Sequence, residues 1–307
     1  MKIFIILFTL LVVNGCSNSK MTNQIYDPDF IPQIEFPKFS TGTGPKVFID
    51  EAHNNFHTID GRYKPFADLL RKDGYRVLPF KEIFTQANLK AVDILVIVNP
   101  VHISNIGSWS LPTPSAFTES EIEIVNNWVR EGGKLWLIAD HMPIPGAAKE
   151  LALSFGFKLE NGFAYAPDDK SWIKFSREKA TLNKHIISNG RKDYEFVNSV
   201  QTYTGHAFQI PAGAESILQF ENGSYSLNPK TAHKFDKDTP RLDVSNWSQG
   251  AVRDYGKGRL AVFGEAGAFT AQISGKKMKK WGMNSVEGAD NSRFVLNVIH
   301  WLSGDLY

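Results

Sequence analysis

Acidic, imidazole and amide side chains follow four apolar segments of this chain, each directly after the segment ends. Carboxylates and imidazoles gathered in one place can move protons in catalysis, or can hold a divalent metal ion and activate water. The candidate catalytic residues are Asp50, Glu51, His53, Asp140, His141 and Glu265, and the candidate substrate-binding residues are Asn54, His57, Asn99, His102 and Trp109.

Each of these residues also has an ordinary structural interpretation. Asp50 or Asp140 alone can cap the next helix, and Asn99 can close a turn. Their joint occurrence after separate apolar segments favours a functional site. No Glu-x-x-His motif is present to fix a metal. A divalent metal is therefore an open cofactor hypothesis, with the identity of the metal unknown.

Other chemistries lack their motifs. The sequence contains no Gly-x-Ser-x-Gly elbow, no Gly-x-Gly-x-x-Gly and no Walker loop, so neither a serine nucleophile nor a nucleotide cofactor is indicated. Cys16 is the only cysteine. It lies in the N-terminal leader, and a cysteine nucleophile in the folded part is therefore excluded. The formal net charge of +2 implies no strong field for nucleic acid.

The apolar segments alternate with stretches of helical spacing, which predicts an α/β fold. We expect strands over 47–49, 75–78, 92–98, 135–139 and 259–263, and helices over 62–73, 115–131, 146–155 and 291–302. Thr118 and Glu121 have the spacing of a capping box at the start of the second helix. A doubly wound parallel sheet brings the carboxyl ends of its strands to one edge, where ligands bind.

Residues 160–250 lose this alternation and predict a mostly β insertion. Within it, segments 216–220 and 224–227 flank Asn222-Gly223, which is typical of a β-hairpin. The loop over 101–117 carries Trp109, which either stacks on a sugar ring or folds within its own loop. The basic run Lys276–Lys280 is either a solvated loop or a surface that steers an anionic substrate, such as a uronate or a sulfated glycan.

The N-terminus has the features of an export signal. Lys2 precedes an apolar run over 3–13, which is too short to span a bilayer, and Cys16 follows at the cleavage position. This pattern resembles the lipobox of bacterial lipoproteins, in which the cysteine is acylated and becomes the mature N-terminus. We expect a signal peptide over 1–15, a tether over 16–45 and a lipid anchor in the cell envelope, with Ser17 compatible with the outer membrane.

Residues 50–57, 140–143 and 263–266 resemble the DUF4350-type branch of the class I glutamine-amidotransferase-like superfamily. The resemblance covers roughly residues 46–303 and implies a flavodoxin-like fold for the domain over 46–307. Amidotransferases of that superfamily use a Cys-His-Glu triad with its cysteine on an elbow after a strand. Here Asp140 occupies that region, so the resemblance does not imply glutamine hydrolysis.

These observations lead to one functional expectation with two rivals. We expect an envelope hydrolase acting on a carbohydrate or a related small molecule. Asp50 or Asp140 would be the base or a metal ligand, and His53 or His141 the acid or a second ligand. The rivals are a non-catalytic glycan-binding lipoprotein and an accessory subunit of a transport or gliding assembly.

Replacement of Cys16 by Ser tests the lipid anchor. We expect the variant to lose acylation and to move from the membrane fraction to the soluble fraction, because each buried acyl CH₂ contributes about 0.8 kcal/mol to membrane binding. Cell fractionation and mass spectrometry of the mature N-terminus measure both effects. A variant that stays as membrane-bound and as fully processed as the wild type would contradict the lipoprotein interpretation.

Overall fold

A computed structural model describes residues 24–306, so the expected signal peptide, Cys16 and the first part of the tether lie outside the described residues. Five parallel strands form one half of its largest sheet, as predicted. In spatial order they are β3 (Arg76–Phe80), β2 (Lys46–Asp50), β4 (Ile94–Val98), β5 (Lys134–Ile138) and β15 (Gly258–Phe263). This 2-1-3-4-5 order is that of a flavodoxin-like fold.

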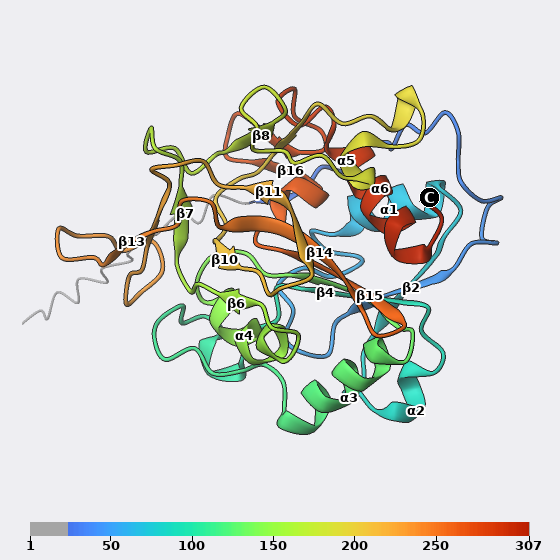
Figure 1. Ribbon diagram of the computed structural model, residues 1–307, viewed down its shortest axis with the longest axis horizontal. Coiled ribbons are helices and arrows are strands. Elements are labelled where there is room, and N and C mark those ends of the chain that lie inside the picture. Colours follow the sequence, from blue (N-terminus) through green and yellow to red (C-terminus); the bar gives the residue numbers. More distant parts are fainter. Residues whose placement is uncertain (1–23, 307) are drawn as a thin grey trace, which may run out of the picture.

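Antiparallel strands extend the sheet beyond β15 (Figure 1). β14 (Ser248–Tyr255) pairs with β15, and both β11 (Ala214–Gln219) and β10 (Phe208–Gln209) pair with β14. β6 (Lys158–Leu159) pairs with β10 at the end of this order. The parallel half of the sheet therefore carries most of the predicted site residues, and the antiparallel half comes largely from the predicted insertion.

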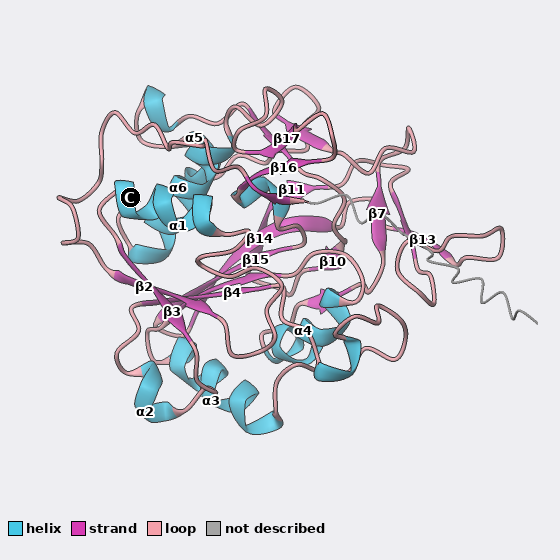
Figure 2. Ribbon diagram, turned by 180° about the vertical axis from the view of Figure 1, so that it is seen from behind, coloured by secondary structure: helices cyan, strands magenta, loops and turns pink. Residues whose placement is uncertain are grey.

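Helices cover both faces of the sheet (Figures 1 and 2). One face carries α2 (Gln86–Leu89), α3 (Glu119–Arg130) and α4 (Ile144–Ser154). The other face carries α1 (Lys64–Lys72), α5 (Ile186–Asn189) and α6 (Asn291–Ser303). Two hydrophobic cores, one under each helical layer, hold this sandwich together.

Local sequence explains why these elements begin and end where they do. All five residues of β4 are buried, as expected for a central strand with helices on both sides. The Thr118 side chain accepts from the Glu121 backbone N–H and the Glu121 carboxylate accepts from Thr118, so the predicted capping box starts α3. α1 ends before Gly74, whose φ of +94° lies in the region that favours glycine.

The insertion is mostly β, but its predicted hairpin is wrong. A turn does form at Asn222-Gly223, yet its flanking strands join different sheets. β11 pairs with β14, whereas β12 (Tyr225–Leu227) pairs with β7 (Phe163–Tyr165) and β13 (Arg241–Asp243). The turn thus passes the chain between two sheets, because pairing with distant strands outweighs the local turn preference. β8 (Lys174–Ser176) and β9 (Ser199–Gln201) form a further antiparallel pair.

The described part of the expected tether, residues 24–45, is packed against the domain instead of extending away from it. β1 (Ile25–Tyr26) pairs with β16 (Ala271–Ser274), which in turn pairs with β17 (Lys279–Gly282). The Phe39 ring packs edge-on to Tyr75, with ring centroids 5.1 Å apart. Apolar side chains spaced through this Pro-rich segment pack against the domain. The sequence did not predict this packing, because the segment lacks helical periodicity.

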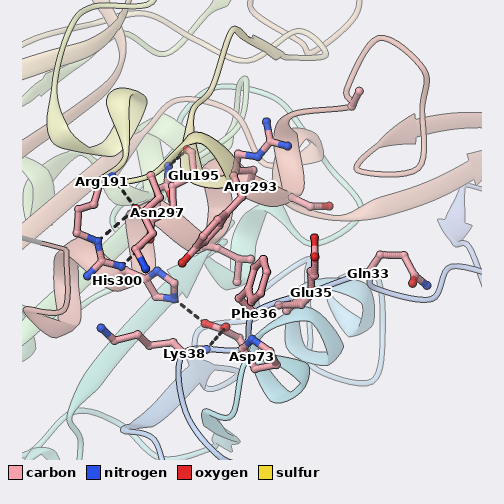
Figure 3. A pocket seen from close by; sticks show the side chains of 17 residues that line it. Gln33, Glu35, Phe36, Lys38, Asp73, Arg191, Glu195, Arg293, Asn297 and His300 are labelled. Atoms are coloured by element: carbon pink, nitrogen blue, oxygen red, sulfur yellow. Dashed lines mark hydrogen bonds and ion pairs between the residues drawn. The ribbon is translucent and has the colours of Figure 1, made fainter.

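A cavity of about 710 Å³ lies between residues 33–38 of this segment and α6 (Figure 3). At its wall the imidazole of His300 lies 2.6 Å from the carboxylate of Asp73, which also accepts the backbone N–H of Lys38. The remaining short elements are the 3₁₀ turns Ile103–Asn105, Asp193–Glu195 and Gly267–Phe269. Among residues 24–306 no helix is long and apolar enough to cross a membrane.

Substitution of Gly74 by Ala tests the docking of residues 24–45. A Cβ at Gly74 would lie 2.4 Å from the Phe39 carbonyl oxygen, whereas one at Gly42, also at positive φ, meets no atom within 4 Å. We expect Gly42→Ala to cost about 1 kcal/mol of unfolding free energy from backbone strain alone. Gly74→Ala should cost roughly 1–3 kcal/mol more through the added clash. Urea denaturation measures both, and equal losses would contradict the docked arrangement.

Candidate functional site

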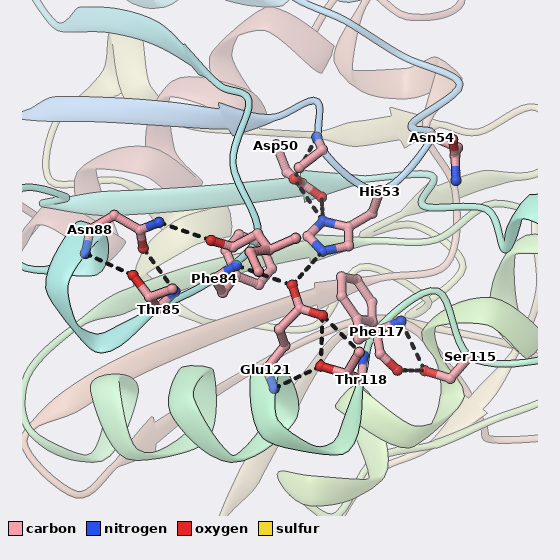
Figure 4. Close-up of polar contacts among 12 residues, drawn as sticks. Asp50, His53, Asn54, Phe84, Thr85, Asn88, Ser115, Phe117, Thr118 and Glu121 are labelled. Carbon is pink, nitrogen blue, oxygen red and sulfur yellow. Dashed lines mark hydrogen bonds and ion pairs between the residues drawn. The ribbon is translucent and has the colours of Figure 1, made fainter.

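A buried ion network follows the end of β2 (Figure 4). The His53 Nδ1 atom lies 2.9 Å from both carboxylate oxygens of Asp50, and its Nε2 lies 3.0 Å from Oε1 of Glu121 at the start of α3. The imidazole also contacts the rings of Phe84 and Phe117, each with a centroid distance of 4.6 Å. His53 therefore joins the end of a strand to the first turn of a helix.

The charges in this network stabilise one another. Burial lowers the pKa of His53, but hydrogen bonds and charge attraction from Asp50 and Glu121 outweigh it and raise the pKa above its ordinary value. The pKa of Glu121 is lowered because hydrogen bonds from His53, Thr118 and Phe84 outweigh its burial. An imidazole held by two carboxylates has both nitrogens occupied. We therefore assign Asp50 and His53 to positioning α3, not to proton transfer with a ligand.

Three further predicted residues hold loops. Glu51 accepts the backbone N–H of Ile59 at 2.8 Å, and Asn54 donates to the Val101 carbonyl at 3.1 Å. The His102 ring accepts from the Ser104 backbone at the start of a 3₁₀ turn. These contacts fix the loops after β2 and β4, and they give each residue a structural role.

Asn99, at the end of β4, organises a second network through its side-chain amide. Its Oδ1 accepts the backbone N–H of Asp140 at 2.9 Å, and its Nδ2 lies 3.0 Å from Nδ1 of His57. Because the amide nitrogen donates, Nδ1 of His57 accepts and the ring proton resides on Nε2. Burial, with a contribution from the Arg62 charge, lowers the pKa of His57 to about 3. His57 is thus a neutral hydrogen-bond donor at every physiological pH.

Asp140 and Glu265 follow the neighbouring strands β5 and β15 and form an electrostatically coupled pair of carboxyl groups. Glu265 is 2% exposed, and burial followed by repulsion from Asp140 raises its pKa to about 8. Backbone N–H groups of Gly267 and Ala268 donate to its two oxygens at 2.5 and 2.8 Å. Glu265 therefore retains a proton at neutral pH despite these favourable hydrogen bonds.

Asp140 is the more accessible member of this carboxyl pair. It is half-buried, and burial raises its pKa, although nearby His141 and Arg62 oppose the shift. The His141 Nδ1 atom lies 2.9 Å from the Met142 carbonyl oxygen, an acceptor, so the neutral ring carries its proton there and leaves Nε2 as an acceptor. A carboxyl group with a raised pKa and an imidazole whose Nε2 is a hydrogen-bond acceptor are therefore adjacent in sequence.

Aromatic rings surround His141, the residue that follows Asp140. Trp109 lies 5.4 Å from Phe56 and 5.8 Å from His141 between ring centroids, and His141 stacks on Phe163 at 4.5 Å. The Trp109 carbonyl accepts the backbone N–H of Ala232, which ties its loop to the insertion. Phe56 is exposed, and Trp109 and His141 are partly so. These residues form a partly open aromatic surface beside the acids.

The predicted residues thus divide between two networks. The strands that carry them are parallel, as expected, but the contacts of Asp50 and His53 lead to α3, whereas Asp140, Glu265 and His141 lie together with Asn99 and His57. Sequence reasoning missed Glu121, Arg62 and His206. The Glu121 capping position concealed its second role, and no local motif marked Arg62. His206 is fully buried with Nδ1 3.2 Å from the Asp140 carbonyl oxygen, and burial lowers its pKa to about 3.

The donor groups do not fit a metal centre. In the described portion of the chain, no group of three or more His, Cys, Asp or Glu side chains is arranged to hold a metal ion. Asp50 and His53 already bond to each other and to Glu121, and Glu265 accepts backbone N–H groups.

Comparison with known proteins supports the fold. The solved structure of the mmIFT52 N-terminal domain is similar with a TM-score of 0.60 and 14% identity, covering 84% of this chain and 97% of that chain. Weaker likenesses, both with a TM-score of 0.43 and 11% identity, are to a ThuA-like protein from Bacteroides uniformis, covering 89% of this chain and 94% of that one, and to a GMP synthase subunit from Thermoplasma acidophilum, covering 85% and 94%. No protein-family model and no curated protein matches the sequence.

The coupled carboxyl groups predict a pH-dependent stability. The folded chain keeps the Glu265 proton up to about pH 8, whereas the unfolded chain releases it near the ordinary pKa of glutamate. The contribution of Glu265 to the free energy of unfolding therefore falls as the pH rises from that ordinary pKa to about 8. Asp140→Asn removes the repulsion and lowers the pKa of Glu265. We expect the variant to gain about 1–2 kcal/mol relative to wild type between pH 5 and 8.

Urea denaturation at several pH values measures this difference. Asp60→Asn, at an exposed aspartate of the loop after β2, is the matched control and should follow the wild-type pH profile. If the profile of Asp140→Asn runs parallel to that of the wild type, the two carboxyl groups are not coupled.

Proposed function

We propose that this chain is a lipid-anchored envelope hydrolase that cleaves a carbohydrate at the rim formed by Asp140, Glu265 and His141. The observation that carries the proposal is the buried carboxyl pair at the ends of two adjacent parallel strands. Ligands of open α/β sheets bind at this edge. A carboxyl group that stays protonated near pH 7 is costly to maintain and is typical of a proton donor in catalysis.

The protonation states assign the roles. In hydrolysis, water attacks the bond carbon, the leaving oxygen takes one proton, and a base takes the proton that water loses. The coupled pair of Asp140 and Glu265 keeps one proton at neutral pH, and Asp140, its accessible member, passes this proton to the leaving oxygen. The Nε2 atom of His141 accepts from water. This assignment reverses the expectation of an aspartate base and a histidine acid, and it follows from the raised pKa of the pair and the hydrogen bond of His141 Nδ1.

The aromatic surface supports a carbohydrate as the substrate. Sugar rings present C–H faces that pack against aromatic side chains while their hydroxyl groups remain hydrated. Phe56 and Trp109 supply partly open rings beside the acids, and Trp109 contacts the imidazole assigned as the base. A sugar packed on these rings would therefore bring its glycosidic bond towards Asp140.

A non-catalytic glycan-binding protein is the second candidate. The hydrogen bonds from Gly267 and Ala268 to Glu265 favour it, because they give this carboxyl group a structural role in fixing the turn after β15. With that role, Glu265 need not take part in catalysis. In this alternative the aromatic surface holds the glycan and no bond is cleaved.

An accessory subunit of a transport or gliding assembly is the third candidate. The loop after β4 exposes Ile103, Ile106 and Leu111 with 72%, 57% and 52% of their surface accessible, and neighbouring exposed apolar groups are typical of interaction surfaces.

The lipid anchor at Cys16, an outer-membrane location and membership of the DUF4350-type branch complete the proposal. They rest on the sequence features described above.

Turnover of purified full-length protein on neutral and acidic oligosaccharides tests the catalytic proposal. We expect Asp140→Asn to lower kcat by at least about 100-fold, because it removes the proton donor. Sugar affinity should change little, and Asp60→Asn should retain wild-type turnover. Reducing-end release measures the rate, and calorimetry measures the affinity.

Three results would contradict parts of this proposal. Undiminished turnover in Asp140→Asn would remove Asp140 from the mechanism. Oligosaccharide binding by wild type without any product would favour the glycan-binding alternative. Absence of both binding and product across the panel would leave the assembly role as the remaining candidate.

A further inference from the structure

Arg62 is an unused cation at the rim of the candidate site. Its side chain is half-buried, and its guanidinium lies 4.4 Å above the ring of Phe56. Among residues 24–306 no carboxylate lies within ion-pair distance of it and no acceptor forms a hydrogen bond with its side chain. Burial lowers its pKa, and the charge of Asp140 opposes that shift, which places Arg62 within the electrostatic reach of the acid pair.

His57, whose side chain is buried, supplies a second donor within the electrostatic reach of this cation. Asn99 holds its Nδ1 as an acceptor, which leaves the proton on Nε2, and the Arg62 charge contributes to keeping the ring neutral. The side-chain amide of Asn99 cannot flip without losing the hydrogen bond that its Oδ1 accepts from the Asp140 backbone N–H. A guanidinium and a neutral N–H donor within electrostatic reach of each other can both recognise one oxyanion.

We propose that Arg62 and His57 bind the carboxylate of an acidic sugar, so that the substrate of this site is a glycan containing uronic acid. The inference rests on the proposed function and names its substrate class. The planar guanidinium matches a carboxylate through two parallel N–H···O bonds, and its contact with the Phe56 ring favours this cation at the rim. Phe56 and Trp109 would then carry the ring of the same sugar.

The geometry favours a sugar acid over a free small anion. The aromatic rings adjoin the cation directly, since Phe56 contacts both Arg62 and Trp109. A free anion would use the guanidinium alone and gain nothing from these rings. A uronate uses both, because its carboxylate and its ring C–H face belong to one residue.

Calorimetric binding to full-length protein tests this inference. The probes are oligosaccharides of galacturonate, mannuronate and glucuronate, each compared with its methyl ester, together with a neutral and a sulfated galactan oligosaccharide. We expect at least one uronate to bind about 10–100-fold more tightly than its ester, as loss of a charge-assisted hydrogen bond implies. Arg62→Gln should abolish the preference for the free acid and leave ester binding unchanged.

Two variants control for charge and folding. Arg62→Lys keeps the charge but loses the planar fork, and it should recover only part of the preference. Arg71→Gln changes an exposed arginine of α1 and should bind as the wild type does. Thermal melts of each variant confirm that it is folded.

The outcomes separate this inference from the proposed function. Equal binding of acid and ester, with cleavage of either, overturns the role of Arg62 and leaves the hydrolase intact. Tighter binding of the sulfated probe than of every uronate overturns the carboxylate assignment in favour of sulfate. No binding of any oligosaccharide overturns both proposals.

Discussion

The placement of a buried and a half-buried carboxyl group at the ends of adjacent parallel strands is the constraint on which the rest of this structure depends. Asp140 and Glu265 follow β5 and β15, whose pairing sets the two groups side by side. Repulsion in a site of low dielectric opposes a second negative charge, so the pair retains a proton at neutral pH. Asn99 and the backbone N–H groups after β15 hold the pair in place, which indicates that the fold tolerates the cost of its burial.

A second buried set of charges has the opposite character. Asp50, His53 and Glu121 satisfy one another, and the charged forms of His53 and Glu121 are favoured, whereas those of the carboxyl pair are not. This set ties α3 to β2 and fixes one helical layer, whereas the carboxyl pair keeps a proton and lies within the electrostatic reach of Arg62. The neighbouring group, more than residue type, separates the two sets: Glu121 bonds to an imidazole, whereas Glu265 faces a second carboxyl group.

Much of this was predictable from local sequence patterns. The apolar run of β4, the Thr118–Glu121 capping box and the helical spacing over 62–73 predicted elements that the structure confirms. Parallel strands then require residues that follow them to share an edge. The Asn222-Gly223 turn predicted a hairpin that does not form, because the strands on either side of it pair with strands far away in the sequence. The partners of His53 and the surroundings of Arg62 depend on segments far apart in the chain, and no single-segment pattern records them.

The protonation of the carboxyl pair is the central claim, and it can be measured directly. Full-length protein labelled with ¹³C at the carboxyl carbons of Glu and Asp can be titrated by NMR, with Asp140→Asn assigning the pair. The account predicts a Glu265 carboxyl signal that titrates with a pKa of about 8, well above its ordinary value, and shifts to lower pH in the variant. Titration of both carboxyl groups near their ordinary pKa values in the wild type would contradict it.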